Sequence, residues 1–160
     1  MNIRIGKVFT GVLGLLALAA GGMIYMLYRT REMLVFRLTD YLGISSWIHR
    51  MREHAPVLSV PEWVIYSLPG GLWTAAYILI MDAITHRWTQ KRRLLWTMSI
   101  PMMGVASEIL QALGWLPGTF DIIDALCYVL PYAIYLCHTC RSESQKNRRS
   151  QLPNFKMSHI

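Results

Sequence analysis

This chain of 160 residues is long enough for a single domain, but 54% of its residues are apolar and only 16% are charged. A water-soluble fold of this composition would have too little polar surface to cover itself, and the same composition excludes an intrinsically disordered chain. The formal net charge of +7 comes from short basic clusters beside apolar segments, not from a nucleic-acid-binding motif, so membrane lipids are the expected partner and nucleic acid is not. We expect an all-α polytopic membrane protein, a bundle of about four transmembrane helices.

The first apolar segment covers residues 8–28 and follows the basic residues Arg4 and Lys7. It is long enough to cross a hydrocarbon core of about 30 Å. Ala17-Leu18-Ala19 also offers the small-residue cleavage pattern of a signal peptide, which leaves open whether the segment is retained or cleaved. The apolar residues continue well past that site and favour a retained helix.

The segment after the first span, residues 29–61, is mixed in composition. Apolar residues such as Leu38, Trp47 and Ile48 recur at roughly helical spacing among basic residues. This pattern is typical of an interfacial amphipathic segment at the level of the lipid head groups.

Three further spans are expected at residues 63–83, 94–113 and 120–140. Pro69-Gly70-Gly71 should kink the second span or break its hydrogen-bond ladder. The turn between the last two spans is short, which makes them antiparallel neighbours, and Asp121 or Thr119 is placed to cap the last one. Residues 1–140 would then form the transmembrane domain, and residues 141–160 a basic cytoplasmic tail.

Basic residues set the expected orientation, because Lys and Arg are retained on the cytoplasmic side. They cluster at the amino end, in the connection at residues 87–93 and in the tail, and none lies in the turn at residues 114–120. Both termini are therefore expected inside, although the loop after the first span contains five arginines accompanied by acidic residues.

Acidic residues inside the predicted spans form the candidate site, because each costs about 2.5 kcal/mol or more at the centre of a membrane helix. Glu108 shares a helical face with Gln111, and Asp121 shares one with Asp124. At a rise of about 1.5 Å per residue, Glu108 lies about 7 Å below the end of its span and Asp124 about 5 Å below the start of the next. Ser67 falls at a similar depth on the second span. The spacing predicts a polar cluster in the outer third of the bilayer.

Structural alternatives stand beside this prediction. Asp121 could serve only as a helix cap, and Glu108 with Gln111 could form interhelical hydrogen bonds with Glu108 protonated. Trp73, beside the glycines of the second span, either lines a cavity or packs against a neighbouring helix. Asp82, near the inner end of that span, is expected to pair with Arg87 or to be solvated.

Cysteine and histidine do not predict a metal site. The three cysteines Cys127, Cys137 and Cys140 are expected to be free thiols. Cys137-His138-Thr139-Cys140 has a two-residue cysteine spacing, but no second pair follows to complete four zinc ligands.

Two sequence motifs resemble the VanZ-like family of small bacterial membrane proteins. They are Ser107-Glu108-Ile109-Leu110-Gln111 followed by Pro117-Gly118-Thr119-Phe120-Asp121-Ile122-Ile123-Asp124, and Ser67-Leu68-Pro69-Gly70-Gly71-Leu72-Trp73 in the preceding span. The resemblance covers roughly residues 60–140. Many family members have an arginine in the turn before the first aspartate and an asparagine soon after the second, where this chain has Pro117-Gly118-Thr119 and Tyr128.

The resemblance implies a multi-pass protein of the bacterial cytoplasmic (inner) membrane that works at the cell envelope. The family is named for an association with resistance to the glycopeptide teicoplanin, which implies no particular reaction, and resistance itself is not transferred to this chain.

Three functional hypotheses follow. In the first, Glu108, Asp121 and Asp124 act as general acid or base, or hold a divalent cation against the phosphate of a lipid or lipid-linked envelope intermediate, while Gln111, Ser67 and Trp73 bind the head group. The second is a non-catalytic module that binds a lipid or a partner membrane protein in the same groove. The third, less favoured, is a small transporter subunit, since four spans leave little material for a pathway unless copies form a homo-oligomer. The sequence identifies no substrate and no cofactor, and it leaves open whether the protein is an enzyme.

Overall fold

The computed structural model of the chain describes residues 3–29, 34–54 and 60–151, and every regular element among them is an α-helix. The expected all-α class is confirmed. The helices are α1 (Ile3–Tyr28), α2 (Leu34–Tyr41), α3 (Ser45–His54), α4 (Glu62–Tyr66), α5 (Leu68–Ile84), α6 (Gln90–Ala112) and α7 (Ile122–Gln151).

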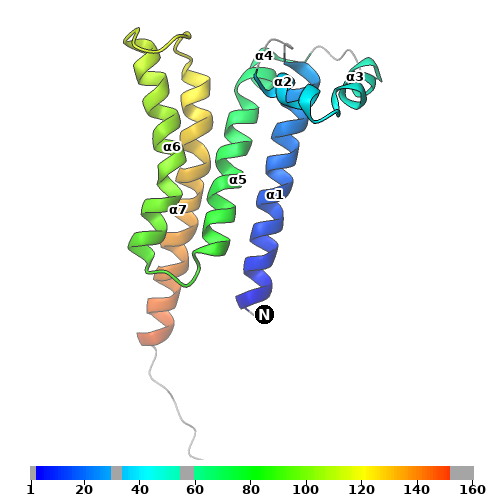
Figure 1. Cartoon of the computed structure of the whole chain (residues 1–160). Helices are drawn as coiled ribbons and strands as arrows, with labels where there is room; N and C mark the ends of the chain where they lie inside the picture. The colour runs from blue at the N-terminus through cyan, green and yellow to red at the C-terminus, as the bar shows by residue number, and fades with distance from the viewer. Residues whose placement is uncertain (1–2, 30–33, 55–59, 152–160) are drawn as a thin grey trace, which may run out of the picture.

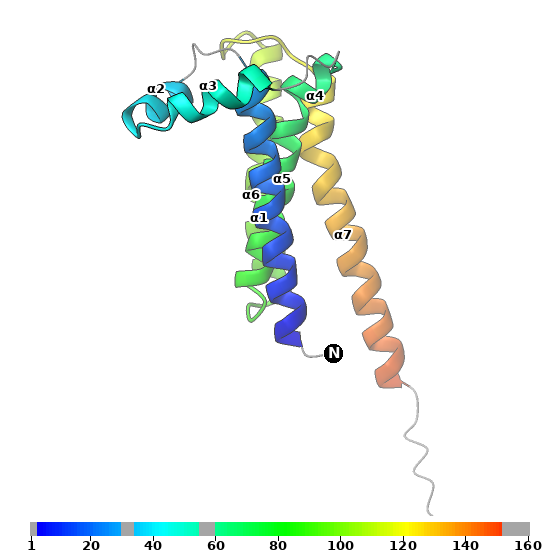
Figure 2. The same cartoon turned by 90° about the vertical axis from the view of Figure 1, so that its right-hand side faces the viewer.

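Four long helices, α1, α5, α6 and α7, lie side by side, and α5 is central to them (Figure 1). It packs against α1 on one side and against α6 and α7 on the other, and α6 also packs against α7. By contrast, α1 and α7 are not packed against each other, and α7 diverges from α1 toward the amino end of α1 (Figure 2). α5 therefore lies between α1 and α7 and contacts both of them.

Glycines let α1 and α5 approach closely. A Cβ atom on Gly14 would lie 2.8 Å from Cγ1 of Ile80, and one on Gly21 would lie 2.7 Å from Nε1 of Trp73. Small residues at a helix interface are the usual means by which membrane helices gain van der Waals contact. The tightest helix pair of the bundle thus depends on residues that have no side chain.

The break in the predicted second span lies before the glycines, which corrects the expected position. α4 ends at Tyr66, Ser67 lies between the two helices, and α5 begins at Leu68 and continues through Gly70 and Gly71. The proline is the physical reason: its ring clashes with the carbonyl four residues back, but it fits the first turn of a new helix. The glycines instead allow α7 to approach, as described below.

The last helix extends into the residues predicted to form the basic tail. α7 continues through the basic segment to Gln151. Charged residues such as Arg141 and Glu143 are good helix formers, so the end of the apolar segment does not end the helix. The rest of the predicted tail, residues 152–160, lies outside the described residues.

The short helices α2 and α3 lie across the end of the bundle at which α1 ends (Figure 2). Arg52 of α3 donates hydrogen bonds to the carbonyl oxygen of Leu27 (3.1 Å), in the last turn of α1, and to that of Arg29, which follows α1. Carbonyl groups at this end of a helix have no partner within the helix. Ile48 is buried, whereas Trp47 is exposed. The hydrogen bonds of Arg52 thus fix α3 against the end of α1.

Two of the described helices are long and apolar enough to cross a membrane, over Gly6–Tyr28 and Ile122–Gln145. Only 11% and 6% of the residues in their most apolar windows are buried, so neither resembles the buried core helix of a soluble protein. α5 is apolar but shorter, with 17 residues. α6 has sufficient length, but Lys91, Arg92 and Glu108 lower its mean hydropathy.

Most of the fully buried side chains among the described residues are polar. Apart from glycine and proline, three apolar residues are buried (Ile48, Ala76 and Ile78), against eight polar ones: Thr39, Ser67, Thr74, Asp82, Thr85, Thr97, Glu108 and Thr139. Several of the threonines donate to a carbonyl one turn back in their own helix, as Thr74 does to Gly70 (2.9 Å). Large apolar side chains such as Phe9, Leu16 and Met103 are more than 60% exposed.

Candidate functional site

The ring of Tyr128 forms the floor of the candidate site: it extends from α7 and lies against α5 and α6. A Cβ atom on Gly104 of α6 would lie 2.5 Å from Cγ of Tyr128, and one on Gly70 of α5 would lie 3.3 Å from its hydroxyl oxygen. Gly71 meets Cys127 of α7 in the same way, at 3.1 Å. Glycine is required at Gly104, because the ring occupies the place of its side chain.

Three polar side chains lie one turn from this ring, toward the end that holds the α6–α7 turn: Ser67 just before α5, Glu108 on α6 and Asp124 on α7. Residues three or four apart share a helical face, so Glu108 stands above Gly104, Ser67 above Gly70 and Gly71, and Asp124 above Tyr128. All three helices reach this end of the bundle together (Figure 1). We call Ser67, Glu108 and Asp124 the polar layer.

The polar layer is incompletely hydrogen-bonded, with two of its residues buried and Asp124 half-buried. Glu108 is 3% exposed and Ser67 is 2% exposed. Oγ of Ser67 and Oδ1 of Asp124 are buried without a hydrogen-bond partner among the described residues. A buried polar atom without a partner costs about 1–3 kcal/mol, so these two atoms are placed to receive a ligand group or a water molecule.

Glu108 has one partner in the turn that follows its helix. Its Oε2 accepts a hydrogen bond from the backbone N–H of Asp121 at 3.2 Å. The bond fixes the start of α7 against the end of α6 and orients the Glu108 carboxyl group. Gln111 lies outside the polar layer, packed beneath the turn: a Cβ atom on Gly118 would lie 3.0 Å from its Cδ.

Asp121 caps α7. Its Oδ1 accepts the backbone N–H of Ile123 at 2.8 Å, as expected for an aspartate just before a helix. The capping alternative considered from the sequence thus describes the geometry of Asp121. Its side chain is occupied at the helix end, and its backbone, not its carboxylate, contacts Glu108.

Trp73, predicted either to line a cavity or to pack, lies against α1, and a role for it in binding stays a prediction. Its ring packs against α1, with its centroid 5.4 Å from that of Tyr25. The ring of Trp73 fits against α1 because Gly21 has no side chain there. Gly71, which meets Cys127 of α7, lies on another face of α5. Of the two alternatives for Trp73, the structure shows packing.

No metal-binding set is present in the described part of the chain: no group of three or more His, Cys, Asp or Glu side chains is placed to hold an ion. The carboxylates of Glu108, Asp121 and Asp124 therefore do not form a joint set of cation ligands. The cysteines Cys127, Cys137 and Cys140 are free.

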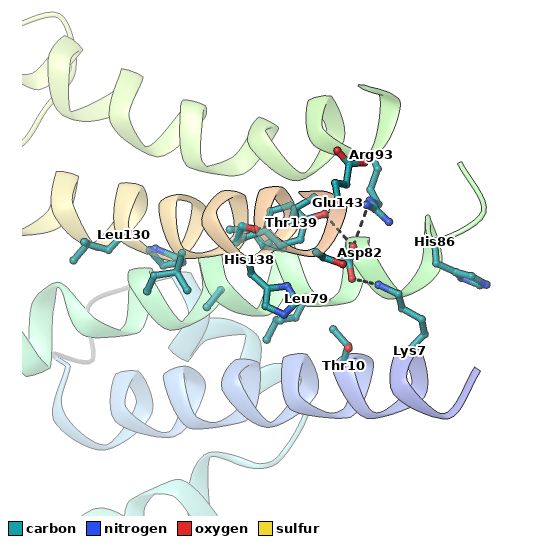
Figure 3. Close-up of a pocket in the computed structure, with 16 residues that line it drawn as sticks. Lys7, Thr10, Leu79, Asp82, His86, Arg93, Leu130, His138, Thr139 and Glu143 are labelled. Carbon is teal, nitrogen blue, oxygen red and sulfur yellow. Dashed lines mark hydrogen bonds and ion pairs between the residues drawn. The ribbon is translucent and has the colours of Figure 1, made fainter. Parts of the chain in front are cut away.

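A second polar group, which sequence reasoning did not identify, surrounds Asp82 at the opposite end of the bundle. Lys7 of α1 forms an ion pair with Oδ2 of Asp82, Nε of Arg93 of α6 lies 3.5 Å from Oδ1, and the hydroxyl of Tyr135 of α7 donates to Oδ1 at 2.9 Å (Figure 3). Asp82 is 7% exposed. The sequence had predicted that Asp82 pairs with Arg87 or is solvated, and the structure shows neither.

The partners of Asp82 are remote in sequence, which explains why local spacing missed them. Arg87 is five positions away and lies in the turn after α5, outside the helical geometry that brings residues three or four apart together. One signal was present: Lys7, Asp82 and Arg93 each lie near the same predicted end of a span, where one buried carboxylate requires a cation.

Comparison with family models, characterised proteins and solved structures adds no identification: no family model, no characterised protein and no solved structure matches this chain.

Proposed function

We propose that this chain is a VanZ-like, four-span protein of the bacterial cytoplasmic membrane that binds a lipid or a lipid-linked envelope intermediate at the polar layer of Ser67, Glu108 and Asp124. In this proposal the bilayer surrounds the exposed apolar faces of α1, α5, α6 and α7. The distribution of polarity supports it, because a polar interior beneath an apolar surface is costly in water and favourable in lipid.

The proposed topology has both termini in the cytoplasm and the α6–α7 turn outside. A cysteine-free version of the chain carrying Thr119→Cys should react with a membrane-impermeant maleimide added to intact cells. The same version carrying Lys91→Cys should react only after the cells are opened. Equal labelling of both positions in intact cells would refute the orientation.

One observation carries the proposed site: two buried polar atoms at the same level of neighbouring helices, Oγ of Ser67 and Oδ1 of Asp124, have no hydrogen-bond partner among the described residues. A structural role alone would favour complete hydrogen bonding within the protein, because unpaired atoms lower stability. A phosphate or hydroxyl group of a lipid head group would provide the missing partner for Ser67 as an acceptor and for Asp124 as a donor.

The chemistry open to this layer is proton transfer. A carboxyl group beside a bound substrate can serve as a general acid or base. In the proposal Glu108, oriented by the backbone of Asp121, acts as the general acid or base, and Asp124 with Ser67 positions the head group.

The test replaces the carboxyl groups of Glu108 and Asp124, one at a time, by amides of the same shape. A strain that lacks the protein is complemented with the wild type, with Glu108→Gln or with Asp124→Asn, and its envelope lipids and lipid-linked intermediates are profiled. Asp40→Asn, at an exposed acidic residue of α2 that lies outside both the polar layer and any described pocket, is the control. We expect both layer variants, but not the control, to reproduce the profile of the deletion. Wild-type profiles from both layer variants at equal expression would refute the proposal.

A non-catalytic binding module is the second candidate, favoured by the hydrogen bond that already occupies Glu108 and by the capping role of Asp121. It differs from the first in one measurement. Purified protein that retains a lipid through the polar layer but converts none of the envelope intermediates offered to it would favour the module, whereas conversion that is lost in Glu108→Gln would favour the enzyme.

A further inference from the structure

A groove of about 860 Å³ opens between α1 and α7, at the end of the bundle opposite the polar layer (Figure 3). Its floor is α5, and it is open at the side because α1 and α7 are not packed against each other. Sites for small ligands usually have volumes of about 300–1,000 Å³. In a membrane, such an opening faces the lipid directly.

The groove is polar at one end and apolar at the other. Lys7 and Asp82 lie at its inner end, near the start of α1 and the end of α5. Ile78, Leu130 and Ile134 line it further toward the middle of α5 and α7. Polarity therefore changes along the groove in the same direction as it does in a lipid lying parallel to the helices, with the head group at the membrane surface.

The polar end has more cationic donors than acceptors. Asp82 is the only partner that the described residues provide for Lys7 or Arg93, and one carboxylate neutralises only one of these two cations. The Nε of Arg93 lies 3.5 Å from Asp82 but is buried without a hydrogen bond. The side chains of Lys7 and Arg93 are 28% and 19% exposed, so they remain within reach of a bound group.

Other titratable groups around the polar end do not cancel this excess. His86 and His138 also line the groove and contribute either no charge or a positive one. Glu143 also lines the groove, near Arg93 in Figure 3, but its side chain is exposed and water screens its charge. A phosphodiester matches the remaining charge and donors, since Arg and Lys side chains are the common ligands of phosphate in proteins.

We infer that this groove binds a glycerophospholipid of the inner leaflet, with its phosphodiester on Lys7 and Arg93 and an acyl chain along Ile78, Leu130 and Ile134. Basic pockets between helices on the cytoplasmic side are suited to lipid phosphate, and here an apolar wall continues from the basic end. The inference rests on the membrane insertion proposed above, and it is independent of the polar layer.

The test measures lipid retained by the full chain. Protein extracted from membranes in mild detergent is offered phosphatidylglycerol, phosphatidylethanolamine, diacylglycerol or inorganic phosphate, and binding is followed by native mass spectrometry. We expect the two phospholipids to bind, and diacylglycerol and inorganic phosphate to bind at least tenfold more weakly. If diacylglycerol bound equally well, the phosphate would not contribute to binding. If inorganic phosphate bound equally well, the acyl chains would not contribute. Either result overturns the inference.

Paired variants locate the site. Arg93→Gln should weaken phospholipid binding about tenfold, the loss expected for one charge-assisted hydrogen bond, whereas Arg92→Gln, an exposed neighbour that does not line the groove, should not. Leu130→Trp fills the apolar wall and should also weaken binding, whereas Leu126→Trp, one turn away and outside the groove, is its control. Equal effects within either pair would overturn the assigned position.

Failure of this inference is distinguishable from failure of the proposed function. Binding that is unchanged in both groove variants, in protein that still fractionates with membranes, refutes the groove alone. Protein that is recovered without membranes refutes the proposed insertion. Neither result depends on Glu108 or Asp124.

Discussion

Replacing Gly104 by alanine tests whether the Tyr128 ring fixes α6 against α7. A Cβ atom at Gly104 would lie 2.5, 2.7 and 2.8 Å from Cγ, Cδ1 and Cδ2 of Tyr128. Non-bonded carbon atoms prefer separations of about 3.5–4.0 Å, so the ring must move by about 1 Å. These ring atoms are the ones nearest the backbone, so a side-chain rotation alone gives little relief, and the helices must separate.

The expected cost follows from two opposing terms. Overpacking of this kind typically costs about 1–3 kcal/mol, while glycine to alanine within a helix gains about 0.5–1 kcal/mol. Gly22→Ala in α1 is the matched control, because a Cβ atom there has no neighbour within 4 Å and only the favourable term applies. Gly104→Ala should therefore be less stable than Gly22→Ala by about 1–3 kcal/mol.

Reversible denaturant unfolding of the detergent-solubilised protein measures both variants. Adding Tyr128→Leu to Gly104→Ala should recover part of the loss, because the smaller side chain vacates the position of the new methyl group. The reasoning is refuted if Gly104→Ala unfolds at the same denaturant concentration as Gly22→Ala, since the ring would then not confine the helix.

Three further predictions concern single hydrogen bonds. Asp121→Ala should destabilise the protein by about 1 kcal/mol, and Asp121→Asn by much less, because asparagine also caps; equal losses in unfolding experiments would argue against the cap. Tyr135→Phe should cost about 1.5 kcal/mol by removing the bond to the buried Asp82 carboxylate, and an unchanged unfolding midpoint would contradict that bond. Arg52→Met should speed hydrogen exchange in α3 and the last turn of α1, compared with the exposed control Arg50→Met; the same exchange in both would exclude the bridge between these helices.

The order and type of the long helices were predictable, because runs of apolar residues and the helical rise depend on neighbours in the sequence alone. The exact break in the second long helix was not. Pro69 tolerates a position in the first turn of a helix as well as a kink within one, and only packing decided that the chain would break at Ser67. The glycines that suggested a break are instead contact points for Tyr128 and Cys127.

The candidate site was predictable to the extent that it depends on depth. Rise per residue placed Glu108, Asp124 and Ser67 at one level, and the structure has them on three adjoining helices; their function stays a prediction. The rotation of each helix about its axis could not be read from depth, so the sequence did not show which helix Trp73 contacts. Tyr128 was not selected, since aromatic residues in apolar helices are common and only its glycine neighbours distinguish it.

Asp82 makes contact with one residue from each of the other three long helices: Lys7 of α1, Arg93 of α6 and Tyr135 of α7. Any motion that preserves these three contacts must turn about that point. Ser67 lies fifteen positions earlier on nearly continuous helix, about 22 Å away at a rise of about 1.5 Å per residue. A tilt of about 5° about Asp82 would therefore displace the far end of α5 by about 2 Å. Helices that tilt about Asp82 therefore move least at this point and most at the opposite end of the bundle, where the polar layer lies.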